Sequence, residues 1–196
     1  MNIILASNNT NKLKEMRDKL SKYNMNVISQ KEAGYDLDIE ETGTTFEENA
    51  TIKATEIYNL SKMPVIADDS GLIIDSLDGA PGVYSHRFAG PNATDEDRIN
   101  KALTLLKDVP DNKRTARFKC VICYIDEIGK KHIFEGTAEG KIALEPRGNN
   151  GFGYDPIFIC ENNKTFAELT GEEKNKISHR GRAIEKFVDY LNEVKQ

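Results

Sequence analysis

Three clusters of polar residues in this sequence could do chemistry: the segment 7–12, the acidic residues between positions 40 and 69, and the segment 151–180. Each cluster interrupts an otherwise ordinary pattern of core residues. Each also falls where a strand is expected to give way to a loop, and α/β proteins place their ligands at such points.

The first cluster consists of Ser7, Asn8, Asn9, Thr10, Asn11 and Lys12. Backbone N–H groups at the start of a helix suit an anion, and Lys12 adds a point charge. The segment is neither a Walker A loop nor a GxGxxG fingerprint. A polar loop that only caps a helix is the alternative interpretation, and this segment taken alone favours it.

The second cluster combines Glu40, Glu41, Asp68 and Asp69. Two acidic residues directly after the apolar strand predicted at 65–67 are costly to place at the end of a sheet unless something positive meets them. Oxygen ligands without sulfur suit Mg²⁺, which takes one or two carboxylates and completes its shell with water and substrate phosphates. A solvated acidic turn explains an isolated Asp-Asp pair equally well.

The third cluster joins the glycine loop 151–156 to Lys174 and to the Ser-His-Arg segment 178–180. Phe152 and Tyr154 offer aromatic faces for a base, and Asp155 offers an acceptor for a ring N–H. His179 and Arg180 could donate to a carbonyl oxygen. The alternatives are a loop anchored in the core and cations on a solvated helix face.

The elements that must position these clusters follow from periodicity and capping signals. Apolar runs predict strands at 3–6, 65–67, 116–126, 131–142 and 156–159, with a hairpin turn at Gly129. Helical spacing predicts a first helix that contains Leu13, Met16 and Leu20, helices opening at Thr45 and Thr94, a capping box at Thr170 and a last helix along 183–191. Helices mixed with parallel-type and hairpin strands predict an α/β fold with a mixed central sheet and flanking helices.

Composition limits the classes of function. The chain has 196 residues and no convincing linker, which predicts one domain over 1–196. A formal net charge of -5 argues against a partner that is a nucleic-acid polymer. No apolar run approaches the ~20 residues that span a bilayer, so we expect no membrane partner and a cytoplasmic protein.

Cys120 and Cys123 have CxxC spacing but fall on a predicted strand. Residues three apart on a strand point to opposite faces, so a shared metal or a redox disulfide is not expected. Buried structural thiols in a reducing compartment are the better interpretation.

The sequence resembles the inosine triphosphate pyrophosphatase family from residue 3 to about residue 188. The resemblance rests on these segments, in the family order: Ser7-Asn-x-x-x-Lys12, Glu41-Thr-Gly-Thr-Thr-Phe-Glu-Glu-Asn-Ala50, Ala67-Asp-Asp-Ser-Gly-Leu72, Gly79-Ala-Pro-Gly-Val-Tyr-Ser85, Gly151-Phe-Gly-Tyr-Asp-Pro156 and Lys174-x-x-x-Ser-His-Arg180. His86 stands where many bacterial and archaeal members have Ala, a departure that touches none of the roles below.

The resemblance implies an elongated α/β fold of two lobes enclosing an active-site cleft, usually a homodimer, and a Mg²⁺-dependent pyrophosphatase of inosine, deoxyinosine and xanthosine triphosphates. It implies that Glu40 and Asp69 bind the metal and that Asp69 is also the general base. The implied substrate contacts are Ser7, Asn8, Asn9, Thr10, Asn11, Lys12, Lys53, Ser70, Phe152, Gly153, Tyr154, Asp155, Lys174, His179 and Arg180. Reasoning from residue types alone did not find Lys53 and did not separate Glu40 from Glu41.

The reaction that the family carries out is attack of water on the α-phosphorus, which releases a monophosphate and pyrophosphate. Hypoxanthine and xanthine carry an oxygen at position 6, where adenine carries an amino group. A donor from His179 or Arg180 would fit the oxygen and oppose the amine. We therefore expect selectivity to reside in the segment 178–180.

Overall fold

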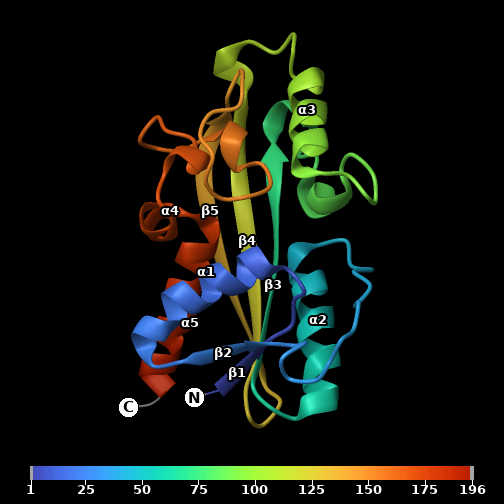
Figure 1. Ribbon diagram of the computed structural model, residues 1–196, viewed down its shortest axis with the longest axis vertical. Helices are drawn as coiled ribbons and strands as arrows, with labels where there is room; N and C mark the ends of the chain where they lie inside the picture. Colours follow the sequence, from blue (N-terminus) through green and yellow to red (C-terminus); the bar gives the residue numbers. More distant parts are fainter. Residues whose placement is uncertain (1, 195–196) are drawn as a thin grey trace. The chain divides into compact units, whose positions relative to one another are not determined.

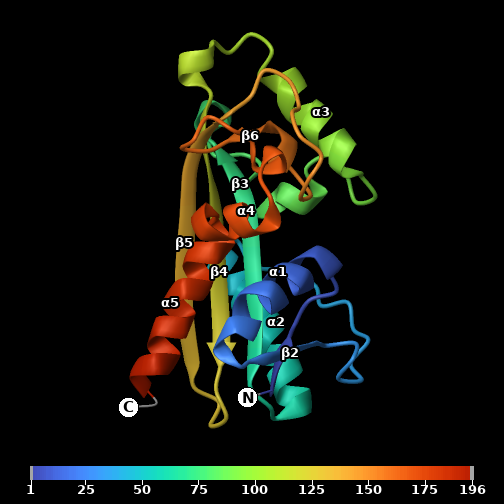
Figure 2. The same cartoon turned by 60° about the vertical axis from the view of Figure 1, so that its left-hand side comes forward.

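The computed structural model describes residues 2–194. Six strands form one sheet in the order β2-β1-β3-β4-β5-β6 (Figures 1 and 2). The strands are β1 (Asn2–Leu5), β2 (Asn26–Ser29), β3 (Val65–Ile74), β4 (Thr115–Ile125), β5 (Lys131–Ile142) and β6 (Phe158–Ile159). Strand β1 pairs parallel with β2 and β3, whereas β5 pairs antiparallel with β6. The predicted α/β class and mixed sheet are confirmed.

Five α-helices accompany the sheet within residues 2–194. They are α1 (Thr10–Leu20), α2 (Phe46–Ser61), α3 (Asp95–Leu105), α4 (Gly171–Ile177) and α5 (His179–Val194). Capping boxes open α2 at Thr45, α3 at Thr94 and α4 at Thr170, where each threonine hydroxyl accepts from the third helical residue. Local sequence signals therefore define these three helix starts, as predicted.

Strand β3 corrects one expectation about the acidic pair. We expected Asp68 and Asp69 after the end of a strand, but β3 runs from Val65 to Ile74 and contains both. The chain stays extended because Leu72 and Ile74 are also buried, and because cationic side chains meet both carboxylates. The acidic pair thus lies on regular, rigid structure.

Two smaller differences concern short strands. Strand β2 was not predicted, because Val27 and Ile28 are only two apolar residues between polar neighbours. The strand expected at 156–159 shrinks to β6, since residues 155–157 form a 3₁₀ turn. Both segments are too short for periodicity to identify them.

The chain divides into two compact units. The first comprises the chain up to Asp69, residues 120–136 and the chain from Arg180 onward. The second comprises residues 70–119 and 137–179. Strands β3, β4 and β5 contribute residues to both. The prediction of one domain over 1–196 stays a prediction.

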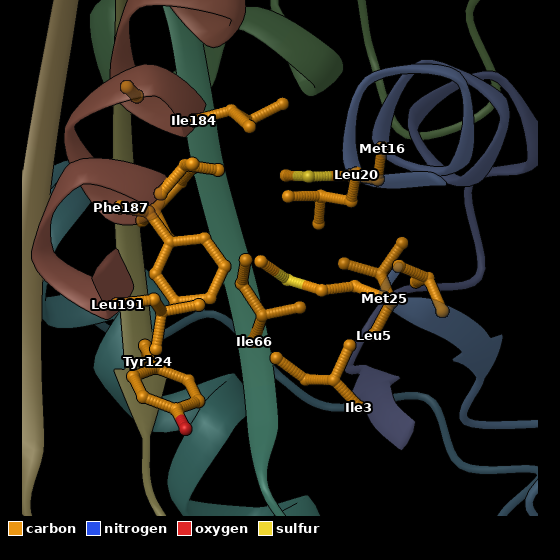
Figure 3. Packing of buried hydrophobic residues seen from close by; sticks show 14 of the residues in the cluster. Ile3, Leu5, Met16, Leu20, Met25, Ile66, Tyr124, Ile184, Phe187 and Leu191 are labelled. Carbon is orange, nitrogen blue, oxygen red and sulfur yellow. The ribbon is translucent and has the colours of Figure 1, made fainter. Parts of the chain in front are cut away.

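The core of the first unit has two clusters on opposite faces of its strands. One packs α1 and α5 against Ile66 and Tyr124, with Phe187 and Leu191 directed toward Ile66 (Figure 3). The other packs α2 against the opposite face, and α2 lies on the other side of the strands from α1 and α5 (Figure 1). Cys120 belongs to the first cluster and Cys123 to the second, so the two thiols face apart as predicted.

The second unit has its own core, in which α3 and the segment 154–169 pack against residues of β3, β4 and β5. Strands β4 and β5 run side by side and are joined by the turn at 126–130 (Figure 2). This arrangement confirms the predicted hairpin. Within residues 2–194, none of the helices combines the length and the apolar character needed to span a bilayer.

Candidate active site

In the first unit, the Asp68 carboxylate is fully buried and contacts two cationic side chains. Its Oδ2 accepts from Arg180 Nε at 3.1 Å and Arg180 Nη2 at 3.0 Å. Lys12 Nζ lies 3.1 Å from the same oxygen. A buried carboxylate held by a bidentate guanidinium and a lysine is a structural counterion, because its charge is already matched by protein groups.

Arg180 is the second residue of α5 and is itself buried, with 2% of its surface exposed. Its guanidinium also donates to Glu15 on α1. Burial acts to lower the pKa of Arg180, but the carboxylates of Asp68 and Glu15 outweigh it and raise that pKa. The structure thus places Arg180 on two carboxylates, and its role as a donor to the base stays a prediction.

Asp69 is the next residue of β3 and points to the other face of the strand. It is 5% exposed, and its Oδ2 accepts from Asn49 Nδ2 at 3.1 Å. Lys53 Nζ lies 3.9 Å from its Oδ1. Burial raises the pKa of Asp69, and the opposing effects of Lys53 and Lys12 do not cancel that rise. A carboxylate of raised basicity beside a cation is suited to accept a proton from water.

Lys53 connects this carboxylate to the acidic loop. Its ammonium donates to Glu41 Oε1 and, at 2.8 Å, to the main-chain oxygen of Asp68. Burial acts to lower the pKa of Lys53, but the carboxylates of Asp69 and Glu41 prevail and raise it. Lys53 is therefore a firmly charged group that a phosphate could contact.

A sequence signal for Lys53 does exist. Asn49 and Lys53 are four residues apart on α2 and lie within its buried stripe, beside Ala50 and Ala54. Two polar residues within an apolar helical stripe must face a polar feature of the sheet. That feature is Asp69, which the amide and the ammonium both meet.

The two glutamates differ in their surroundings. Glu40 is exposed, whereas Glu41 is half-buried and bound to Lys53. Burial acts to raise the pKa of Glu41, but Lys53 and Lys12 lower it overall, so its carboxylate is charged. Within residues 2–194, no three His, Cys, Asp or Glu side chains gather closely enough to hold a metal ion by themselves. The carboxylates of Asp69 and of the 40–41 segment still fit Mg²⁺, which needs only one or two protein ligands.

The segment 7–12 forms the start of α1. Asn9 caps the helix, because its Oδ1 accepts from Asn11 N at 3.0 Å and Lys12 N at 3.1 Å. Ser7 Oγ in turn accepts from Asn9 N at 3.1 Å, and Asn8 Nδ2 donates to Leu37 O at 2.9 Å. The polar loop is thus a helix cap, the alternative that we considered, and it also presents the half-buried Lys12 beside Asp68.

In the second unit, residues 151–155 form a loop around a buried carboxylate. We term it the base loop, because the family resemblance implies contacts with the base there. Asp155 Oδ2 accepts from Phe152 N at 2.9 Å and from Lys174 Nζ at 2.7 Å. Gly151 has φ +75°, and a Cβ there would lie 2.0 Å from Asp155 Oδ2. Asp155 therefore organises the loop from within, and glycine is required beside it.

The two aromatic residues of the base loop have different surroundings. Tyr154 is buried, its hydroxyl donates to Ser85 O at 2.8 Å, and burial raises its pKa. It is the core anchor that we considered as an alternative. Phe152 is half-buried, and Lys174 Nζ lies 4.9 Å from its ring centroid. Of the two rings, Phe152 is the more exposed.

His179 begins α5 directly after Ser178, an extended residue that ends α4. Its imidazole is 4% exposed and stacks on Phe118, with centroids 4.6 Å apart and planes at 10°. The parallel stack holds the ring in a defined orientation. Ser70 is half-buried on β3, directly after Asp69.

These features define an α/β protein with an acidic and cationic cluster in its first unit and a glycine loop with buried charged and aromatic groups in its second. The sequence matches the Ham1 family over residues 3–190, so the chain belongs to that family.

Relatives and solved structures agree with this assignment. The chain is 51% identical to a dITP/XTP pyrophosphatase of Clostridium perfringens, over 97% of each chain. It is 49% identical to a protein of the same name from Halalkalibacterium halodurans, over 96% of this chain and 98% of the relative. A HAM1 protein structure from Coxiella burnetii superposes with TM-score 0.89 at 49% identity, over 98% of this chain and 99% of that one. The Staphylococcus aureus Ham1 protein gives TM-score 0.87 at 42% identity, with 98% of each chain covered.

Proposed function

We propose that this protein hydrolyses the triphosphates of inosine, deoxyinosine and xanthosine to the monophosphate and pyrophosphate. The observation that carries the proposal is the cluster of Asp69, Lys53, Glu41 and Lys12, which joins a buried carboxylate of raised pKa to two ammonium groups. The names of the relatives from C. perfringens and H. halodurans support the same reaction. Removal of deaminated purine nucleotides from the pool is the biological role that follows.

The residues of the first unit act on the triphosphate. Lys12 and Lys53 hold the phosphate chain by charge, with the loop 7–11 in support. Asp69 orients the attacking water and accepts its proton, a contribution of ~10²–10⁴-fold in such reactions. A bound Mg²⁺, held by Asp69 and by Glu40 or Glu41, would shield the charge of the phosphates and of the leaving pyrophosphate. Glu41 is bound to Lys53, whereas Glu40 is exposed to solvent, and both are candidates for the second metal-binding carboxylate.

The residues of the second unit act on the base. The ring of Phe152 stacks on the purine, and the backbone of the base loop, with Ser70, contacts the nucleoside. His179 donates to the 6-oxygen. Lys174, which is bound to Asp155, adds a positive charge beside the ring of Phe152. Since Arg180 is held by Asp68 and Glu15, His179 is the better donor of the two considered. Selection against a 6-amino group follows because that group would leave the donor unpaired.

Three further properties belong to this proposal: Mg²⁺ as the cofactor, a homodimer as the working form and the cytoplasm as the location. A magnesium requirement follows from the oxygen-only donor set. A triphosphate substrate is found in the cytoplasm, and the net charge of -5 suits a free protein that does not associate with polyanions.

The experiment that tests the function is a panel of inosine, xanthosine, guanosine and adenosine triphosphates, each with and without Mg²⁺. Release of pyrophosphate and monophosphate is measured for each. We expect magnesium-dependent turnover of the first two at a kcat/KM far above that for adenosine triphosphate. Binding without turnover would indicate a nucleotide sensor instead of an enzyme.

Lys12→Ala should raise KM for every triphosphate by the same factor, since a phosphate contact carries no information about the base. Loss of a charge-assisted hydrogen bond of about 1.5–3 kcal/mol corresponds to a rise in KM of about 10- to 150-fold. The matched control is Lys14→Ala, two residues along α1 and exposed. Steady-state kinetics with inosine and adenosine triphosphates measures the effect, and a change confined to one base would contradict the role.

Phe152→Ala should weaken the binding of inosine and adenosine triphosphates by the same amount, about 1–3 kcal/mol for one lost base stack. Stacking does not distinguish substituents on the purine, so the preference ratio should stay the same. Phe152→Tyr keeps the aromatic face and is the control that should retain affinity. Both variants are compared by KM, and a normal KM for Phe152→Ala would place the base elsewhere.

A further inference from the structure

Asp95, the first residue of α3, touches the base loop. Its Oδ2 accepts a hydrogen bond from Gly153 N at 2.7 Å. Its other carboxylate oxygen accepts from the guanidinium of Arg98, one turn further along the helix. An ionised acceptor forms shorter and stronger hydrogen bonds than a neutral one. This contact should therefore stabilise the loop more than a hydrogen bond between two neutral groups.

The contact is fixed at the helix side by Arg98, which is only 7% exposed. Besides Asp95, Arg98 donates to His86 O at 2.6 Å and to Ala93 O at 2.7 Å. The guanidinium therefore ties Asp95 to the segment before α3 and to the 3₁₀ turn at 82–87. Asp95 holds Gly153 from a rigid support.

The base loop needs such a support, because it contains no strand or α-helix. Gly153 has φ +63°, so its own backbone preference does not favour the observed conformation over others open to glycine. Asp155 fixes Phe152 N on one side of Gly153, and Tyr154 is anchored through Ser85 on the other. Between these two hydrogen-bonded residues, the amide of Gly153 donates to Asp95.

We infer that Asp95 is a positioning residue for base recognition: by holding Gly153, it keeps Phe152 in the orientation that stacks on the purine. This inference rests on the proposed function, in which Phe152 contacts the base. Asp95 itself does not touch the reacting groups. Its loss should therefore affect nucleotide affinity and leave the phosphate chemistry unchanged.

Helix capping offers a competing explanation, and the chain provides a control for it. The capping box of α3 is formed by Thr94 and Asp97, and Asp97 is an acidic residue of the same first turn. Asp97→Ala removes the Asp97 half of the capping box and one acidic charge near the helix start, but no contact with the base loop. An effect of Asp95 through helix stability would be reproduced by this variant.

The experiment compares Asp95→Ala, Asp95→Asn and Asp97→Ala in the full-length protein. Asp95→Ala should raise KM for inosine triphosphate about three- to tenfold, the equivalent of one hydrogen bond, with kcat within about twofold of wild type. The inhibition constant of inorganic tripolyphosphate, which has no base, should stay unchanged. Asp95→Asn should recover part of the affinity, since its amide oxygen can still accept from Gly153 N. Asp97→Ala should lower the thermal midpoint and leave KM as in wild type.

Hydrogen exchange provides a readout that needs no turnover. The amides of residues 152–154 should exchange faster in Asp95→Ala than in wild type or Asp97→Ala. Unchanged exchange and KM in Asp95→Ala would overturn the inference, as would an equal rise of KM in Asp97→Ala or an equal rise of the tripolyphosphate inhibition constant. If wild type cleaves no nucleotide, the proposed function fails, and the exchange data alone decide whether Asp95 holds the loop.

Discussion

Asp69→Asn should fold normally and lose turnover by at least about 10²-fold, because the substitution removes the carboxylate that the water requires. Asparagine has nearly the same shape and is neutral. Burial already raises the pKa of Asp69, so the fold gains little from its charge. We therefore expect the thermal midpoint to stay close to that of wild type. Initial rates of pyrophosphate release from inosine triphosphate measure the loss.

The matched control is Asp189→Asn, the same chemical change at an exposed position of α5. It should leave both rate and stability unchanged. Turnover by Asp69→Asn close to that of wild type would exclude Asp69 as the general base and would make Glu41 the next candidate. Affinity for the nucleotide should fall much less than the rate, because Lys12 and Lys53 remain to hold the phosphates.

Arg180→Ala should destabilise the protein by about 3–5 kcal/mol, the typical result of removing one partner from a buried ion pair. Asp68 would keep its full burial and lose both hydrogen bonds from the guanidinium. Lys12 shares the same carboxylate oxygen, so its position should change and activity should fall. Denaturant unfolding measures the first effect, and kcat/KM for inosine and adenosine triphosphates measures the second.

The ratio of the two kcat/KM values distinguishes the two roles of Arg180. If the guanidinium only holds Asp68, the ratio should stay within about twofold of wild type while both values fall. If Arg180 instead donates to the 6-oxygen, its loss should lower the preference for inosine over adenosine triphosphate, as we expected from the sequence. Lys186→Ala, an exposed cation on the same helix, should leave stability and ratio unchanged.

Helix starts and strand faces were predictable because they depend on neighbours in the chain. A threonine hydroxyl and a glutamate three residues later satisfy each other wherever the helix begins, as at Thr45 and Thr170. The alternation of a strand placed Cys120 and Cys123 in separate core clusters without any knowledge of the fold. The motifs that relate the chain to the Ham1 family are likewise contiguous stretches.

The pairing of charges was not predictable in this way. Asp68 and Asp69 are adjacent and chemically identical, yet Asp68 is neutralised by Arg180, 112 positions away, whereas Asp69 faces Lys53 and Asn49 on α2. Strand alternation gives the two carboxylates different faces, but only the packing of α1, α2 and α5 decides which cations each face meets. The same holds for Arg180, whose ion pairs with Asp68 and Glu15 depend on tertiary packing; its contact with the base stays a prediction.

The sequence by itself determined the fold class, the family, the polar clusters and most helix starts, since each depends on local periodicity, local capping or contiguous motifs. Tertiary structure alone decided that Asp68 pairs with Arg180 and Lys12, that Asp69 faces Asn49 and Lys53, that Tyr154 is anchored on Ser85, and that Asp95 holds Gly153. The physical reason is that burial and Coulomb energy depend on distances between groups remote in the chain, and residue types do not contain those distances.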